Sequence, residues 1–193
     1  MDAALRQVSD QLDDATQRLL GSARLLSDSE VREPSLLPGW SRAHVLAHLA
    51  RNADALRNVL VGARSGQLLP AYASAQARAD DIEHGSRHNA RELAEDVAAA
   101  AMALRTVARQ LPAEAWRFDV RILDSPGFPA AEVLTRRLVE VELHHGDLGT
   151  GYGPAGWPAA FAAMDLAEPM RSWRQDRLSW AAQATGNGQP SQA

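Results

Sequence analysis

Three side chains that can bind a metal ion lie in two segments with helical spacing. Glu140 and His144 are four residues apart, so on a helix they project from one face, one turn apart, and can reach a shared ion. His48, in the other segment, could supply a third ligand. Two imidazoles and one carboxylate around a zinc-type ion leave a fourth position open for a substrate atom, which is typical of catalytic zinc. The pattern therefore predicts metal-assisted chemistry.

The composition restricts which other groups can take part in that chemistry. The 193 residues include no cysteine, which excludes disulfides, a protein thiol nucleophile and a cysteine-bound metal. His, Asp and Glu remain as strong metal ligands, and any thiol in the mechanism has to come from a small molecule. The net charge of −4 is spread over interspersed acids and bases without a basic run, so we expect no nucleic-acid partner.

Neither a membrane-spanning segment nor a secretory signal is expected. No apolar stretch approaches the roughly 20 residues that span a bilayer. The first residues, MDAALR, lack the apolar core of a secretory signal. We therefore expect a cytoplasmic protein without a membrane partner.

The hydrophobic residues favour an all-α fold. They make up 46% of the chain and are dominated by Ala and Leu, with only 5% aromatic residues. Apolar residues recur at intervals of three and four, which predicts long amphipathic helices. These helices are expected at about residues 2–27, 41–62, 89–111, 130–145 and 158–182. Residues 63–88 are expected to form a loop with one short helix, and residues 116–129 extended chain too short for a sheet.

The breaks between these helices suggest a bundle with a short extension. Pro38 and Gly39 precede Ser41, which we expect to be the N-cap of the second helix. Bundles commonly build metal sites from side chains on facing helices. We expect residues 1–165 to form the bundle. Residues 166–193 are expected to form a C-terminal helical extension, ending in a disordered tail from Thr185 onward.

Two extended motifs carry the metal-binding candidates. The first reads LPGWSRAHVLAHL over residues 37–49 and is followed by Asn52 and Leu56. The second reads RLVEVELHHGDLG over residues 137–149. Their order, spacing and flanks, over about residues 5–165, resemble the mycothiol-dependent maleylpyruvate isomerase family.

This resemblance implies a DinB-like four-helix bundle that binds one zinc through His48, Glu140 and His144. The implied cofactors are zinc, or another divalent metal, and mycothiol, a cysteinyl pseudo-disaccharide that certain bacteria make in place of glutathione. In the resembled enzymes the mycothiol thiolate adds to the cis double bond of maleylpyruvate. Rotation and elimination then leave fumarylpyruvate. The motifs do not identify the residues that contact mycothiol.

Three functions remain open on the sequence. The chain could be a mycothiol-dependent isomerase, a mycothiol S-transferase acting on another electrophile, or a non-catalytic metal-binding interaction protein. The longer relatives carry a second α/β domain that contributes an arginine to substrate binding, whereas the residues after Leu166 do not alternate as strands do. Arg171, Arg174 or Arg177 could partly replace that arginine. The expected partners are a small-molecule thiol and an electrophile.

Four polar residues near the motifs have simpler expected roles. His44 is expected to be a half-buried histidine hydrogen-bonded within the bundle, with a contact to the metal shell or substrate as the alternative. Glu142 should point away from Glu140 and be a solvated surface acid. His145, turned about 100° from its neighbour, should face solvent or a neighbouring loop. Asp147 could orient a ligating imidazole or cap the helix.

Other candidates are expected to be structural. Trp40 should pack the entrance of the second helix over the core, with a cofactor-lining role as the alternative. Arg51 and Arg137 could meet an anionic substrate, although arginines on helix surfaces are common. Glu83, His84 and His88 are expected to be exposed to solvent.

Overall fold

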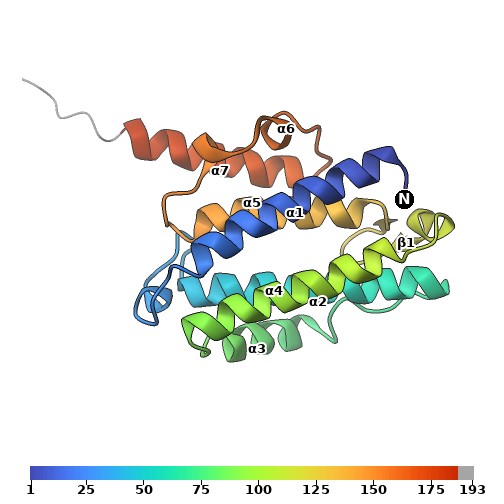
Figure 1. Cartoon of the computed structure of the whole chain (residues 1–193), viewed down its shortest axis with the longest axis horizontal. Coiled ribbons are helices and arrows are strands. Elements are labelled where there is room, and N and C mark those ends of the chain that lie inside the picture. The colour runs from blue at the N-terminus through green and yellow to red at the C-terminus, as the bar shows by residue number, and fades with distance from the viewer. Residues whose placement is uncertain (187–193) are drawn as a thin grey trace, which may run out of the picture.

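Four long helices run side by side and enclose the core (Figure 1). They are α1 (Ala3–Ala23), α2 (Arg42–Ser65), α4 (Ala90–Arg109) and α5 (Glu132–Asp147). The computed structural model describes residues 1–186. Helices α1 and α2 each pack against both α4 and α5, so the four helices close into a ring around a shared apolar interior. The predicted all-α four-helix bundle is confirmed.

A polar cap sets where α2 begins. Ser41 is the N-cap of α2, as predicted, and its hydroxyl accepts a hydrogen bond from the His44 backbone. The His44 ring accepts in return from the Ser41 backbone, which completes a capping box. The same ring lies 3.2 Å from Glu83. His44 is therefore hydrogen-bonded within the bundle, as expected, and its role is to start the helix that carries His48.

A short helix, α3 (Ala75–Gly85), packs along the outside of α2 (Figure 1). The close approach requires small residues at the contact, because a Cβ added to Gly85 would lie 3.1 Å from the Cβ of Ala47. The prediction of one short helix within residues 63–88 is confirmed. Three 3-10 turns also occur in the described chain: η1 (Glu30–Arg32), η2 (Glu114–Arg117) and η3 (Pro154–Gly156).

The connection between α4 and α5 contains two strands of two residues each. Strands β1 (Asp119–Val120) and β2 (Phe128–Pro129) pair in antiparallel fashion, with Val120 opposite Phe128. Extended chain was expected here, but the pairing of its two ends was not. Val120 and Phe128 are both buried, so burial of one residue from each strand holds this small hairpin against the bundle.

The C-terminal region differs from the single helix expected over residues 158–182. The chain forms α6 (Ala159–Ala162), an irregular segment, and then α7 (Met170–Gly186), which packs on α5. Pro169 has no backbone N–H and disfavours helix in the residue before it, which explains the break. Helix α7 reaches Gly186, and the rest of the predicted disordered tail lies outside the described residues. No helix within residues 1–186 is long and apolar enough to span a membrane.

One helix offers a direct test of the packing. Leu104 and Met102 both lie on α4, but Leu104 is 2% exposed and Met102 is 65% exposed. Leu104→Ala should lower the free energy of unfolding by about 2–5 kcal/mol, because it leaves a cavity in the core. Met102→Ala should change it by less than about 0.5 kcal/mol. Chemical denaturation measures both, and equal losses would contradict the packing described.

Candidate metal centre

His48, Glu140 and His144 converge between α2 and α5. The His48 Nε2 lies 3.0 Å from the Glu140 Oε2, and the His144 Nε2 lies 3.2 Å from the same oxygen. One ligand atom from each residue lies within 4.8 Å of the other two, and within residues 1–186 this is the only such group of three. The two imidazole rings meet edge to face, 4.7 Å apart. The structure thus brings the three predicted residues together.

The supporting helices explain this convergence. Glu140 and His144 are one turn apart on α5, and the packing of α2 against α5 presents His48 to both. The Trp40 ring lies 5.5 Å from the His48 ring and 6.3 Å from the His44 ring. Trp40 therefore covers the start of α2, as predicted, and also forms one wall beside His48.

Asp147 orients the His144 ring. Its Oδ2 lies 2.8 Å from the His144 Nδ1, and both of its oxygens accept hydrogen bonds from Arg177 on α7, at 3.2 and 2.8 Å. A proton on Nδ1 leaves Nε2 facing Glu140, so the carboxylate selects which nitrogen is available to an ion. Of the two roles left open for Asp147, orientation of an imidazole is the one observed. Arg177, one of three arginines considered from the sequence, holds Asp147 in place.

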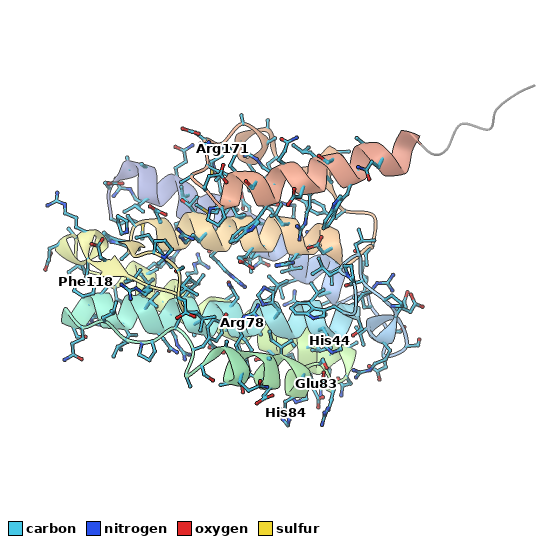
Figure 2. The ribbon with its side chains drawn as sticks, turned by 180° about the vertical axis from the view of Figure 1, so that it is seen from behind. His44, Arg78, Glu83, His84, Phe118 and Arg171 are labelled. Carbon is cyan, nitrogen blue, oxygen red and sulfur yellow. The ribbon has the colours of Figure 1, made fainter. Side chains whose placement is uncertain are left out.

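Arg78 is the residue near the centre that sequence reasoning missed. Its Nη2 lies 3.2 Å from the His48 Nδ1, and its guanidinium lies over the Tyr72 ring, 5.8 Å from the ring centroid. Figure 2 shows Arg78 on the side of α3 that faces the bundle, with His84 on the outer side. No motif marks Arg78, because only the packing of α3 on α2 brings it to the site.

Charge and burial oppose each other at this centre. Burial disfavours ionisation of Glu140, but hydrogen bonds to His144 and His48 outweigh it and hold the carboxyl pKa well below its usual range. Burial also disfavours charge on His144, yet its bonds to Asp147 and Glu140 raise the pKa of this imidazole to about 9. The pKa of His48 is lowered by burial and by the charges of His144 and Arg78. Without a metal, the charge on Glu140 is therefore balanced by a proton on His144.

Glu142 is buried, contrary to the expectation of a solvated surface acid. It is 1% exposed and lies 2.6 Å from Arg18 of α1, and the Tyr152 hydroxyl donates a second hydrogen bond to it. Burial and the neighbouring Glu142 raise the pKa of Tyr152 to about 12. The expectation is wrong because α1 covers the face of α5 opposite Glu140, so both faces of the helix are enclosed.

His145 faces α1 and a neighbouring loop, so the solvent-facing alternative is wrong. The ring is 2% exposed, its Nε2 lies 2.8 Å from the Ser22 hydroxyl, and it stacks on the Tyr152 ring at 3.8 Å. Burial, with the charge of Arg18, lowers the pKa of His145 to about 4. The ring is therefore neutral at pH 7 and packs as part of the interior.

The remaining candidates take no part in the centre. Arg51 is half-buried and pairs with Asp96 on α4. Arg137 is 1% exposed, so a surface position for it is wrong, and its Nη1 donates to the Asn52 side chain at 2.8 Å. Burial lowers the pKa of Arg137 to about 10. The predicted exposure of Glu83 and His84 is confirmed, whereas His88 is half-buried.

Two hollows meet at the centre. The larger has a volume of about 580 Å³ and the smaller about 250 Å³. Their linings share a small set of residues: His48, Arg78, Glu140 and Trp173. A molecule in either hollow therefore reaches the same side chains.

The network around His144 predicts an unusual titration. In metal-free protein the ring should titrate near pH 9, and Asp147→Asn should lower that pKa by about 1–2 units, because it removes a charged acceptor. The folded pKa exceeds the reference value of about 6.5, so the stability that this proton confers should be lost as pH rises through 9. NMR titration of the imidazoles, with exposed His84 as internal control, measures the shift. A value near 6.5 in both proteins would contradict the network.

Comparison with known proteins identifies relatives of this arrangement. One solved structure, a mycothiol-dependent maleylpyruvate isomerase, is similar at 31% sequence identity and a TM-score of 0.78. A histidine-to-alanine mutant of a mycothiol-dependent maleylpyruvate isomerase is similar at 30% identity and a TM-score of 0.78. Each match covers 81% of this chain and 65% of the solved chain. The chain therefore spans less than two thirds of the length of these relatives. A comparison with curated proteins found no match.

A family model matches most of the chain. The match covers residues 12–149 and is to the mycothiol maleylpyruvate isomerase N-terminal domain. This range includes both α2 and α5, and hence all three candidate ligands. The resemblance and the DinB-like fold expected from the sequence are confirmed. The chain belongs to the mycothiol maleylpyruvate isomerase N-terminal domain family.

Proposed function

We propose that this chain is a metal- and mycothiol-dependent isomerase that converts maleylpyruvate to fumarylpyruvate. The observation that carries the proposal is the convergence of His48, Glu140 and His144 beside two hollows, in a chain of this family. The solved relatives are mycothiol-dependent maleylpyruvate isomerases by name.

The residues present fit a zinc-type ion. They offer two imidazole nitrogens and one carboxylate oxygen, the donor set of open catalytic sites, and Asp147 accepts from the second nitrogen of His144 as ligating histidines require. We propose His48, Glu140 and His144 as the ligands. A divalent metal bound there would lower the pKa of an incoming thiol and so favour its nucleophilic thiolate.

The other side chains would position the reactants. Arg78 and Arg177 place positive charge beside the centre, which favours a thiolate and an anionic electrophile. Trp40 and Trp173 line the smaller hollow and reduce the access of water to it. Asp147 keeps a proton on the His144 Nδ1 and so keeps Nε2 turned towards Glu140. The chain has no cysteine, which agrees with a nucleophile supplied by a small molecule.

Metal content tests the ligand assignment. Purified wild-type protein should bind about one zinc per chain, and His144→Ala and Glu140→Gln should each weaken zinc binding by more than about 100-fold, since changes to outer partners alone cost about 10–100-fold. His84→Ala, which removes an exposed histidine, should bind zinc like the wild type. Elemental analysis and competition with a chelator measure both quantities. Full zinc content in both His144→Ala and Glu140→Gln would show that the proposed ligands are wrong.

A zinc-edge absorption spectrum tests the thiol chemistry. A zinc–sulfur distance of about 2.3 Å should appear only after mycothiol is added, because the protein itself has no cysteine. Maleylpyruvate should then be consumed only when both mycothiol and zinc are present, with fumarylpyruvate as the product. Samples lacking one component are the controls. A stable thiol adduct of the electrophile would indicate an S-transferase, and bound zinc without a sulfur signal would indicate a non-catalytic metal-binding protein.

A further inference from the structure

The two hollows at the candidate centre differ in charge. The smaller is lined by Arg78 and Arg177 with Glu140 as its only acid, and although Asp147 pairs with Arg177 from behind, no second carboxylate faces this hollow. The larger hollow has a net negative lining, because three acids outnumber two arginines. These charged residues are Arg78, Arg136, Glu132, Glu140 and Glu168. Because clefts focus the potential of their charged walls, an anion is favoured in the smaller hollow.

Arg78 has hydrogen-bonding capacity to spare, in contrast to its neighbours. Arg177 donates hydrogen bonds to both oxygens of Asp147. Arg136 pairs with Glu132 and stacks on the Phe128 ring. Arg78 makes no ion pair with any residue in the described part of the chain; of its five N–H donors one points at His48 and another meets the Tyr72 hydroxyl, which leaves the others free. A half-buried guanidinium with free donors is suited to bidentate binding of a carboxylate.

The position of Arg78 is well defined by the fold. It lies in the first turn of α3, whose far end packs closely against α2 through Gly85 and Ala47. The Tyr72 ring lies under the guanidinium and leaves its edge directed at the centre. Figure 2 shows the residue on the bundle side of its helix. Arg78 is therefore held where it can contact a molecule that also reaches His48.

Building on the proposed function, we propose that each hollow takes a different reactant. The smaller binds a small anionic electrophile, whose carboxylate pairs with Arg78. The larger binds the uncharged, hydroxyl-rich body of the thiol. The volume of about 580 Å³ lies within the range of about 300–1,000 Å³ usual for sizeable ligands, whereas about 250 Å³ suits only a small molecule. Glu132 and Glu168 can accept hydrogen bonds from hydroxyls, but would repel a second carboxylate.

Calorimetry on zinc-loaded protein can test this assignment with two probes, maleate as a small dicarboxylate and mycothiol as the thiol. Arg78→Gln should weaken maleate binding at least tenfold and mycothiol binding by a much smaller factor, because Arg78 lines both hollows but only maleate offers it a carboxylate. Arg136→Gln is the matched control, because Arg136 lines only the larger hollow, and maleate should bind it as it binds the wild type. Ser125→Phe, which fills part of the larger hollow, should weaken mycothiol binding and leave maleate binding unchanged.

The outcomes separate this assignment from the proposed function. Equal maleate affinity in wild type and Arg78→Gln would overturn the assignment, as would an equal loss in Arg136→Gln. If Arg78→Gln does not fold, Arg78→Lys is the variant to measure. Lysine keeps the charge but loses the bidentate geometry, so maleate should bind several-fold more weakly. An unchanged maleate affinity would overturn the assignment. Wild-type protein that binds neither zinc nor mycothiol would instead overturn the proposed function.

Discussion

Partial burial of the Glu140 carboxylate between α2 and α5, where its side chain is 19% exposed, is the constraint on which the rest of the centre depends. An ionised carboxylate removed from water requires opposite charge close by. In the metal-free chain that charge is the proton on His144, whose pKa is raised to about 9 by the carboxylates beside it. A divalent cation would replace that proton with a larger charge at the same place. The arrangement that stabilises the bundle without an ion is thus also the one suited to a metal.

The partners of Glu140 connect the bundle to the two helices outside it. Asp147 and Arg177 join the centre to α7, and Arg78 joins it to α3. These side chains form a continuous series of contacts across the molecule: Arg177, Asp147, His144, Glu140, His48 and Arg78. In low dielectric, neighbours of this kind polarise one another, so the loss of one contact weakens the next. Helices α3 and α7 therefore contribute to the electrostatics of the centre.

Sequence reasoning succeeded where local geometry decides the outcome. The spacing of Glu140 and His144 and the cap at Ser41 depend on one helix each, and both are observed. It failed for Glu142 and for the solvent-facing alternative of His145, because a helical pattern shows which residues lie on opposite faces but not whether a second helix covers both faces. Arg78 was missed for a related reason, since the packing of α3 leaves no local pattern. The break before Pro169 was missed although the proline itself disfavours helix at that point.

The buried contacts of Glu142 and His145 with α1 have a consequence for the rotational setting of α5. Its polar residues form two contact surfaces, here called seams. In the first, Glu140 faces α2, and in the second, Glu142 and His145 face α1. A rotation of α5 by one residue, about 100°, would turn Glu140 out of the first seam and Glu142 out of the second at the same time. Each seam therefore restrains the other. The position of Glu140 at the candidate metal centre therefore depends partly on the opposite side of the helix, where Glu142 and His145 contact α1 and not the candidate ligands.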